Sequence, residues 1–399
     1  MVKKEKIAFG KLNLLRNDIL NKNKKIRIGF IGGGPSSFIG YTHRLAARFD
    51  NRFEFKAGIF SKNIKKSKNF GSSLGLDHER CYENYNKMAL IESQRKDGIQ
   101  ALGIMTPAGD HLKIAKPFIE KGIHIICDKP LTATISDAEE LKKLVHKNKI
   151  IFALTHNYSA YPMLREAKKI VTMGKIGKVN LVNVEYPQGY TAGIKKKDEK
   201  KTLKWRLDKN ISGPSMILSE IGTHAYHLLR YVTELEVKEL AAEVNTISKE
   251  LTVDDNAFVL LRLNNNARGA IWVSSAATGG ENGLKIRVYG TKGAVEWFQD
   301  DPNNLKFTEL DKPTKIITRA SKGVSNFSLT SSRLAAGHPE GFFEAFANIY
   351  TEFADMINKK TKNKNFVPYF PTIEDGVKGI KFIFAAKKSS KLNSKWIKI

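Results

Sequence analysis

A glutamate and two histidines stand close together near the middle of the chain. Glu220 and His224 are four residues apart, and His227 follows three residues later. Helical residues four apart share a face, so the Glu220 carboxylate can accept a hydrogen bond from one imidazole nitrogen of His224. The other nitrogen is then free to take a proton. We predict a helix over residues 219–232, with Ser219 as N-cap and His224 as a general base oriented by Glu220. The alternatives are a structural histidine or a metal site, and the spacing alone does not make three ligands converge.

A lysine stands at the end of a short apolar run, Ile123 to Pro130. The run is typical of a buried strand, which Pro130 ends because proline has no N–H to give to a neighbouring strand. Lys129 is therefore left at the carboxyl end of a strand, where ligands bind in open α/β sheets. There an ammonium group can donate a hydrogen bond to an oxygen that gains negative charge.

A glycine-rich turn lies between a predicted first strand, residues 26–31, and a predicted helix, residues 38–49. In this context Gly32 and Gly34 would let backbone N–H groups approach a dinucleotide pyrophosphate at the helix N-terminus. Ser37 replaces the third glycine of the usual pattern, and Gly40 comes three residues later, so the loop is either substituted or lengthened. A turn without a ligand is the alternative.

The end of the second predicted strand, residues 53–60, bears on the choice of cofactor. Ser61 and Lys62 stand where a carboxylate would bind the 2′-hydroxyl of NAD and repel the 2′-phosphate of NADP. The missing carboxylate, with Lys65 also near, favours NADP, although Ser61 is compatible with either cofactor.

Alternating strands and helices would position these residues. The predicted strands are residues 26–31, 53–60, 98–105, 123–129 and 150–154, and the predicted helices are residues 38–49, 62–74, 110–121 and 136–148. The last helix would have Ser136 as N-cap and Glu139 as its capping-box partner. The alternation predicts a doubly wound parallel (Rossmann) sheet at residues 25–152, after a basic lead-in at 1–24 with a short helix around Leu12 to Leu20.

The remaining residues, 153–399, predict a second domain of α+β class. Consecutive strands without crossover helices indicate a largely antiparallel, open-faced sheet. The strands are expected at 179–186, 237–248, 257–263, 267–275, 284–289 and 294–298, and the helices at 219–232, 340–357 and 372–389. We expect this domain to bind substrate and to form oligomers.

Composition excludes several classes of protein. The formal net charge of +27 comes from 67 Lys and Arg against 40 Asp and Glu, but the lysines are dispersed and no nucleic-acid-binding motif accompanies them. No run approaches the roughly 18–20 apolar residues that span a bilayer. Two cysteines among 399 residues exclude a disulfide framework. We therefore expect a cytoplasmic protein without nucleic-acid or membrane partners.

The order of these motifs resembles the Gfo/Idh/MocA oxidoreductase family, from about Lys25 to the end of the chain. The motifs are the glycine loop, Thr106-Pro107 with His111, Asp128-Lys129-Pro130, and Glu220-x-Gly222-x-His224. Lys129 matches the lysine of the family's Glu-Lys-Pro motif, and His224 matches its catalytic histidine. Glu220 stands in place of the usual aspartate, Asp128 in place of the usual glutamate, and His227 where many members have a carboxylate or asparagine.

The resemblance implies an NAD(P)-dependent dehydrogenase or reductase acting on a hydroxyl of a sugar or cyclitol, and a homodimer or homotetramer. It also implies that the Lys129–Pro130 bond is cis. The expected catalytic residues are Lys129, His224 and Glu220. The expected cofactor-binding residues are Gly32, Gly34, Ser37, Ser61, Lys62, Thr106, Pro107, His111, Asp128 and Lys129. The expected substrate contacts are Lys129, Asn157, Tyr158, Trp205, Arg206, His224 and His227, and no metal is expected.

Two alternatives come from other classes of protein. One is a regulator of the same fold that senses NAD(P) without turnover, and the other is a structural homo-oligomer with a vestigial pocket. Lys129 and His224 disfavour the regulator, because a sensor has no use for a proton relay.

Overall fold

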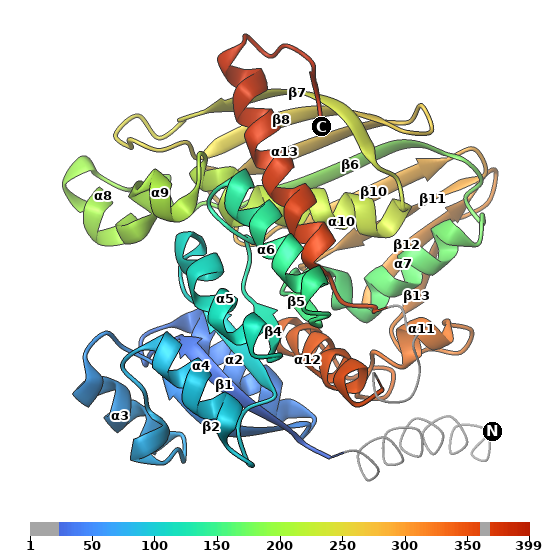
Figure 1. Cartoon of the computed structure of the whole chain (residues 1–399). Helices are drawn as coiled ribbons and strands as arrows, with labels where there is room; N and C mark the ends of the chain where they lie inside the picture. Colours follow the sequence, from blue (N-terminus) through green and yellow to red (C-terminus); the bar gives the residue numbers. More distant parts are fainter. Residues whose placement is uncertain (1–23, 360–367) are drawn as a thin grey trace, which may run out of the picture. The chain divides into compact units, whose positions relative to one another are not determined.

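The computed structural model of the chain describes residues 24–359 and 368–399 (Figure 1). The predicted lead-in at 1–24, with its helix at 12–20, lies outside these residues except for Lys24. The chain forms two compact units. The first extends to Thr132 and adds Ser136–Ala160 and Phe342–Val377; the second comprises Ala133–Ile135, Tyr161–Gly341 and Lys378–Ile399.

The first unit is built on a five-stranded parallel sheet with the order β2-β1-β3-β4-β5. This sheet confirms the predicted doubly wound fold. Its strands are β1 (Ile26–Gly32), β2 (Phe53–Ile59), β3 (Ala101–Met105), β4 (His124–Cys127) and β5 (Phe152–Leu154). Its helices are α2 (Phe38–Phe49), α3 (Ile64–Ser73), α4 (Tyr85–Gln94), α5 (His111–Glu120), α6 (Ile135–Lys147) and α12 (Phe342–Lys359).

The middle strand of this sheet, β3, is apolar throughout because both of its faces are covered. All five residues of β3 are buried, as expected for parallel strands with helices on each side. Helix α12 joins the unit from far along the chain and packs against α2. The Phe53 ring of β2 lies 5.4 Å from the Tyr350 ring of α12, and the Phe353 ring is also in contact.

Three local predictions in the first unit differ from the structure. Strand β4 ends at Cys127 rather than at Lys129. Helix α6 begins at Ile135, so Ser136 lies inside the helix and the prediction that it is the N-cap is wrong. Helix α4 was not predicted, because its buried side chains are only Met88, Ala89 and Glu92, which give weak apolar periodicity.

The second unit is built on a nine-stranded sheet with the order β13-β12-β11-β10-β6-β9-β8-β7-β14. The β6–β9 pair is parallel and the other pairs are antiparallel, which confirms a mostly antiparallel sheet. The strands are β6 (Val179–Pro187), β7 (Val237–Asn245), β8 (Asn256–Leu263), β9 (Arg268–Ser274), β10 (Lys285–Gly290), β11 (Gly293–Phe298), β12 (Asn304–Glu309), β13 (Lys315–Thr318) and β14 (Ile397–Lys398). The helices are α7 (Pro162–Thr172), α8 (Lys196–Leu203), α9 (Lys209–Ser212), α10 (Thr223–Thr233), α11 (Asn326–Leu329) and α13 (Ile373–Lys391), which begins in the first unit.

One face of this sheet is covered and the other is open. Helix α10 packs against β6, β9 and β10, and α7 packs against β11 and β12. Along β8, exposed Phe258 and Leu260 alternate with buried Val259 and Leu261. The alternation therefore separates a core face from an exposed face. Strand β13 was not predicted because none of its residues is buried, so its sequence lacks that alternation.

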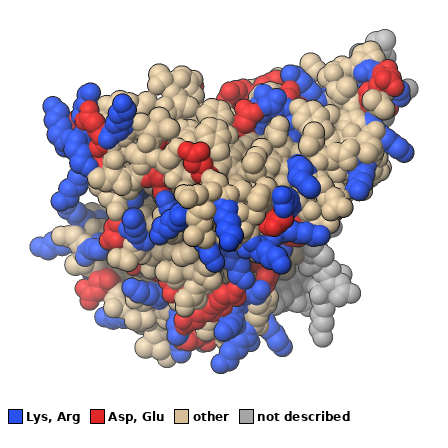
Figure 2. Space-filling view, turned by 90° about the horizontal axis from the view of Figure 1, so that it is seen from above, with Lys and Arg blue, Asp and Glu red and all other residues tan. Residues whose placement is uncertain are grey.

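The charged side chains are spread over the surface. Figure 2 shows Lys and Arg scattered over the visible face, with Asp and Glu between them. Among the described helices, none is both long and apolar enough to cross a bilayer.

Candidate active site

The glycine loop after β1 has the backbone that a dinucleotide loop requires. Gly32 and Gly33 have φ values of 87° and 64°. Residues that carry a Cβ rarely adopt such values. A Cβ on Gly34 would lie 2.6 Å from the Phe60 carbonyl oxygen. A Cβ on Gly33 would lie 2.8 Å from Gly40 Cα, so helix α2 packs directly on the loop. The loop is lengthened, and Gly40 supplies the close packing of the usual third glycine.

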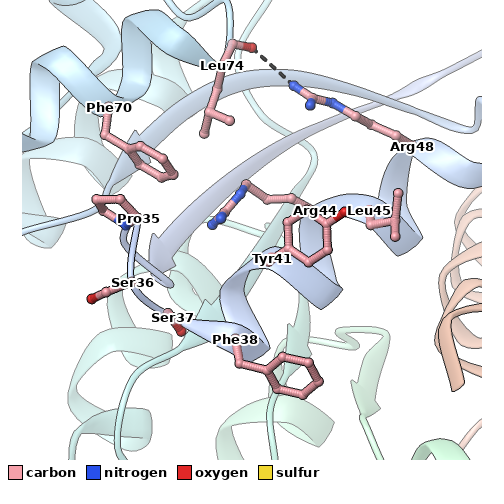
Figure 3. Close-up of a pocket in the computed structure, with 10 residues that line it drawn as sticks. All are labelled: Pro35, Ser36, Ser37, Phe38, Tyr41, Arg44, Leu45, Arg48, Phe70 and Leu74. Carbon is pink, nitrogen blue, oxygen red and sulfur yellow. Dashed lines mark hydrogen bonds between the residues drawn. The ribbon is translucent and has the colours of Figure 1, made fainter.

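Side chains of α2 hold the loop in place. Ser37 is the N-cap of α2, and its Oγ accepts a hydrogen bond from Gly40 N–H at 3.0 Å. The buried Arg44 guanidinium donates to the Gly33 carbonyl oxygen. Arg44 and Arg48 also line a pocket of about 580 Å³ that opens beside Ser36 and Ser37 (Figure 3). The Arg44 guanidinium at the glycine loop suits an anionic group such as a pyrophosphate, whereas Arg48 lies in the last turn of α2 and donates to the Leu74 carbonyl oxygen.

The position that distinguishes the two dinucleotides follows β2. Ser61 is half-buried and its Oγ accepts a hydrogen bond from Asn63 N–H at 3.1 Å. Lys62 is exposed, as are Lys65 and Lys66 at the start of α3. None of residues 60–66, which follow β2, carries a carboxylate, so the local sequence is compatible with a 2′-phosphate.

Among the buried polar atoms of the first unit that lack hydrogen-bond partners within the described residues, two follow the carboxyl ends of strands of the parallel sheet. They are Oγ1 of Thr106, directly after β3, and Nδ2 of Asn157, in the short helical turn Asn157–Ala160. Buried polar groups are nearly always paired. The lack of a protein partner for these two atoms fits a site where a bound ligand supplies the hydrogen bonds. A dinucleotide at the carboxyl ends of β3 and β5 is such a ligand.

Pro107 and His111 shape the segment after β3. Pro107 precedes a 3₁₀ turn, and the fully buried His111 ring lies 2.8 Å from the Thr106 carbonyl oxygen and 3.0 Å from that of Leu131. Both ring nitrogens therefore contact the backbone. His111 connects the segments after β3 and β4, so its expected part in cofactor binding would be indirect.

Lys129 follows the end of β4 and is half-buried. The Lys129–Pro130 peptide bond is cis, as the family resemblance implied. Asp128, the preceding residue, accepts a hydrogen bond from Thr155 Oγ1 at 2.8 Å, and its backbone N–H donates to the Ile104 carbonyl oxygen at 2.9 Å. These contacts attach the residue before Lys129 to the ends of β3 and β5.

In the second unit, His224 lies in the first turn of α10, directly after a π-helical turn, Leu218–Gly222. Such turns are rare and occur often at functional sites. His224 is 7% exposed. The helical segment begins before Ser219, so the prediction that Ser219 is the N-cap is wrong. Asp254 caps this segment instead, because it accepts hydrogen bonds from Ser215 Oγ at 2.7 Å and from Ile217 N–H at 3.1 Å.

Glu220 has a cationic partner that the sequence did not predict. Arg206, on the short helical turn Lys204–Leu207, donates to Glu220 Oε2 at 3.1 Å. The Arg206 guanidinium also lies over the Trp205 ring, 4.6 Å from its centroid. Burial acts to lower the pKa of Arg206, but the charge of Glu220 and their hydrogen bond raise it. The orientation of His224 by Glu220 stays a prediction.

Tyr190 is a residue of this site that the sequence analysis missed. It follows β6 and is 44% exposed. Partial desolvation of its hydroxyl, followed by the charge of Glu220, raises the pKa of Tyr190 to about 12. Its hydroxyl is therefore protonated at neutral pH and can donate a hydrogen bond. The available signal was its position, because residues just beyond a strand end often line a site.

The other predicted substrate contacts are buried. His227 stacks on Tyr231 of the same helix with ring centroids 5.9 Å apart, and Tyr158 has an edge contact with Phe342 at 6.5 Å. Within residues 24–359 and 368–399, no group of three or more His, Cys, Asp or Glu side chains could hold a metal ion.

Each unit therefore brings together its own part of the predicted set. The first holds Gly32, Gly34, Ser37, Ser61, Lys62, Thr106, Pro107, His111, Asp128, Lys129, Asn157 and Tyr158, and the second holds Trp205, Arg206, Glu220, His224 and His227.

Two family models match the chain in the regions of its two sheets. Residues 26–156 match an oxidoreductase family with an NAD-binding Rossmann fold, and residues 164–296 match the GFO/IDH/MocA C-terminal domain. The chain belongs to the Gfo/Idh/MocA oxidoreductase family. It is therefore an NAD(P)-dependent oxidoreductase, and the loop of Gly32 and Gly34 is part of its dinucleotide-binding domain.

Similar members of this family match over nearly the whole chain. An oxidoreductase of Bacillus subtilis, YfiI, is 35% identical over 94% of this chain and 97% of its own length. The crystal structure of an oxidoreductase from Sinorhizobium meliloti is 42% identical, with a TM-score of 0.85 over 94% of this chain and all of that chain. An inositol dehydrogenase homologue from Azotobacter vinelandii, in complex with NADH and myo-inositol, is 31% identical, with a TM-score of 0.86 over 94% of this chain and 98% of that chain.

Proposed function

We propose that the protein is a dehydrogenase that oxidises one hydroxyl of a cyclitol or sugar, or reduces the corresponding carbonyl. The observation that carries this proposal is Lys129, which follows the end of β4 in a dinucleotide-binding domain. In the same unit, buried polar atoms of Thr106 and Asn157 have no hydrogen-bond partner among the described residues, and a ligand could supply one. When bound, a nicotinamide would accept or return the hydride.

The proton chemistry is assigned to the chain's own residues. His224 takes the hydroxyl proton as the hydride leaves, and Lys129 donates a hydrogen bond to the oxygen that gains negative charge. Arg206 holds Glu220 through their 3.1 Å contact, and Glu220 in turn orients His224. Donors aimed at a developing oxyanion contribute roughly 3–4 kcal/mol to catalysis, and a general base about 10²–10⁴-fold in rate.

The substrate class is proposed from chemistry and similarity together. Asn157, which can donate and accept hydrogen bonds, and Trp205 and Arg206, which can donate them, suit a ligand with several hydroxyls. The similarity to the myo-inositol complex of the Azotobacter vinelandii protein supports a cyclitol as the first substrate to try. For the cofactor, Ser61 with Lys62 favours NADP over NAD.

A second function, NAD(P) sensing without turnover, remains the alternative. Tight cofactor binding without oxidation of any polyol would favour it. We also propose that the protein forms a homodimer or homotetramer.

The replacement of Lys129 by Met tests the assignment. We expect the variant to lose at least about 10²-fold in turnover while it binds NAD(P)H almost as tightly as the wild type. The lysine acts on the substrate oxygen, so cofactor affinity should change little. Absorbance at 340 nm with NAD and NADP and a panel of cyclitols and sugars measures turnover, and quenching of protein fluorescence measures cofactor affinity.

The matched control is Lys121→Met, which replaces an exposed lysine of the same unit after α5 and should leave both quantities unchanged. Wild-type turnover in the Lys129→Met variant would refute the role of Lys129.

A further inference from the structure

A buried histidine of α2 lies between a tyrosine and a carboxylate of the same unit. The Nδ1 atom of His43 is 2.8 Å from the hydroxyl of Tyr350 on α12. Its Nε2 atom faces Oδ1 of Asp128 at 3.5 Å and has no closer hydrogen-bond partner among the described residues. His43 and Tyr350 are almost fully buried, and the Asp128 side chain is 14% exposed. None of these three side chains has a role in proton transfer in the function proposed above.

The donors and acceptors of this trio can be ordered from their chemistry. An ionised carboxylate can only accept hydrogen bonds, so the His43 proton must lie on Nε2. In a neutral ring Nδ1 is then the acceptor, and Tyr350 donates its hydroxyl proton to it. Burial, then the charge of Asp128, raises the pKa of Tyr350 well above its ordinary range, which keeps that hydroxyl protonated. The chain of donors therefore runs from Tyr350 through His43 to Asp128.

Asp128 is where the supporting elements meet. It contacts Thr155 after β5, the Ile104 carbonyl of β3 and His43 of α2, and it immediately precedes Lys129. Burial acts to raise the pKa of Asp128, but the hydrogen bond from His43, the charge of Lys129 and the Thr155 hydroxyl lower it overall. A buried carboxylate without such partners would tend to take up a proton and lose its acceptor role.

We propose that His43 is a positioning residue that holds Asp128 ionised and fixed, and thereby sets the place of Lys129 for catalysis. The proposal rests on the catalytic role of Lys129 in the proposed function. Tyr350 fixes the tautomer and ring orientation of His43, so a helix near the end of the chain supports the stretch after β4. The distance from Nε2 to Oδ1 is 3.5 Å, which is long for an N–H···O contact.

A double-mutant cycle of His43→Leu and Asp128→Asn measures this coupling in turnover. We expect His43→Leu to lower kcat by about 10²-fold, the order of loss caused by a misplaced catalytic group. Asp128→Asn should cost a similar factor, and the double variant should cost no more than Asp128→Asn alone. His43→Gln should recover most of kcat, because its side-chain amide can place an N–H near the former Nε2 atom. Losses that multiply in the double variant would overturn the proposal.

The pH profile separates positioning from general loss of packing. Asp128 acts ionised, so activity should fall as the pH drops through its pKa. His43→Leu removes a hydrogen bond that lowers this pKa, so the part of the acid limb that belongs to Asp128 should move to higher pH. In Asp128→Asn that part should be absent, and only the fall caused by protonation of the general base His224 should remain. The polar and titratable groups around this carboxylate and its network are His43, Arg44, Cys127, Lys129, Thr155 and Tyr350. An unshifted acid limb in His43→Leu would contradict the proposal.

Thermal stability gives a readout that needs no turnover. At pH 7 the His43→Leu variant would bury a carboxylate that has lost its hydrogen bond from Nε2, so adding Asp128→Asn to it should raise Tm rather than lower it. Tyr350→Phe should lower kcat, whereas Tyr82→Phe, which removes another buried hydroxyl of this unit from its 2.8 Å bond to Glu92, should not. If the wild type oxidises no substrate, the proposed function fails, while the Tm comparison still decides whether His43 stabilises the ionised Asp128. A fall in Tm on adding Asp128→Asn would show that it does not.

Discussion

Ser61 is the side chain on which the choice of dinucleotide depends most directly. Its hydroxyl, which already accepts from Asn63 N–H, carries no charge and cannot repel a 2′-phosphate. The neighbouring lysines 62, 65 and 66 are exposed and can approach an anion. A preference set in this way is modest, because exposed lysines interact weakly with a partner in water.

The replacement of Ser61 by Asp should shift the protein toward NAD. A carboxylate at this position would accept from the ribose 2′-hydroxyl and repel a 2′-phosphate. We expect the ratio of kcat/KM for NADP over NAD to fall at least about tenfold, equivalent to roughly 1.4 kcal/mol. Kinetics with both cofactors at saturating substrate measure the ratio. The matched control is Asn63→Asp, two residues further along the chain. An unchanged ratio would mean that Ser61 does not face the ribose.

The contact between helix α2 and the glycine loop determines the shape of the cofactor site. Gly33 and Gly40 lie so close that neither has room for a methyl group. Ser37 and Arg44 then attach α2 to the loop from two sides. Any side chain at Gly40 must separate the helix from the loop, which moves the backbone N–H groups that would meet the pyrophosphate.

The replacement of Gly40 by Ala tests this contact. Alanine is favoured over glycine in a helix by about 1 kcal/mol, but forcing a methyl group into a packed contact costs about 1–3 kcal/mol. We expect the collision to dominate, so the free energy of unfolding should fall and the Kd for NAD(P)H should rise at least about tenfold. Urea denaturation and fluorescence titration measure these two quantities. The control is Gly193→Ala, since a Cβ on Gly193 would meet open space; equal effects of both variants would contradict the close-packing argument.

An exposed apolar face in the second unit bears on assembly. Leu181, Phe258, Leu260 and Tyr289 are exposed and lie on one face of the four strands from β10 to β8. Phe258 also stacks on Trp272 with ring centroids 6.1 Å apart. Apolar patches of this kind on a sheet favour a partner surface, and the homo-oligomer proposed above would provide one.

The replacement of Leu260 by Lys should weaken the oligomer. Leu260 is 57% exposed, so the charge should leave the fold intact but oppose burial against a second copy. We expect the mass measured by light scattering after size-exclusion chromatography to shift toward that of the 44.8 kDa chain. The control is Leu310→Lys, at another exposed leucine, in the turn after β12. A monomeric wild type would contradict the proposed assembly.

The local sequence was enough to predict the elements and motifs that depend on neighbours along the chain. The buried runs at β1 and β3, the apolar periodicity of α2 and the glycines between β1 and α2 all act over a few residues. So does the Lys129–Pro130 pair at the end of a strand. These features led to the parallel and antiparallel sheets and to the family, which were confirmed, and to the binding of a dinucleotide by the glycine loop, which stays a prediction.

Only the tertiary structure decided which side chains support those motifs. His43 and Tyr350 are 307 positions apart, and nothing in the periodicity of α12 indicated that it would pack on α2. The partner of Glu220 proved to be Arg206, and Asp254, rather than Ser219, caps the segment before α10. Strand β13 escaped prediction because it buries no side chain. Local sequence patterns indicate which face of each helix or strand is buried and which is exposed. The partner of a buried polar group depends instead on how the whole chain packs.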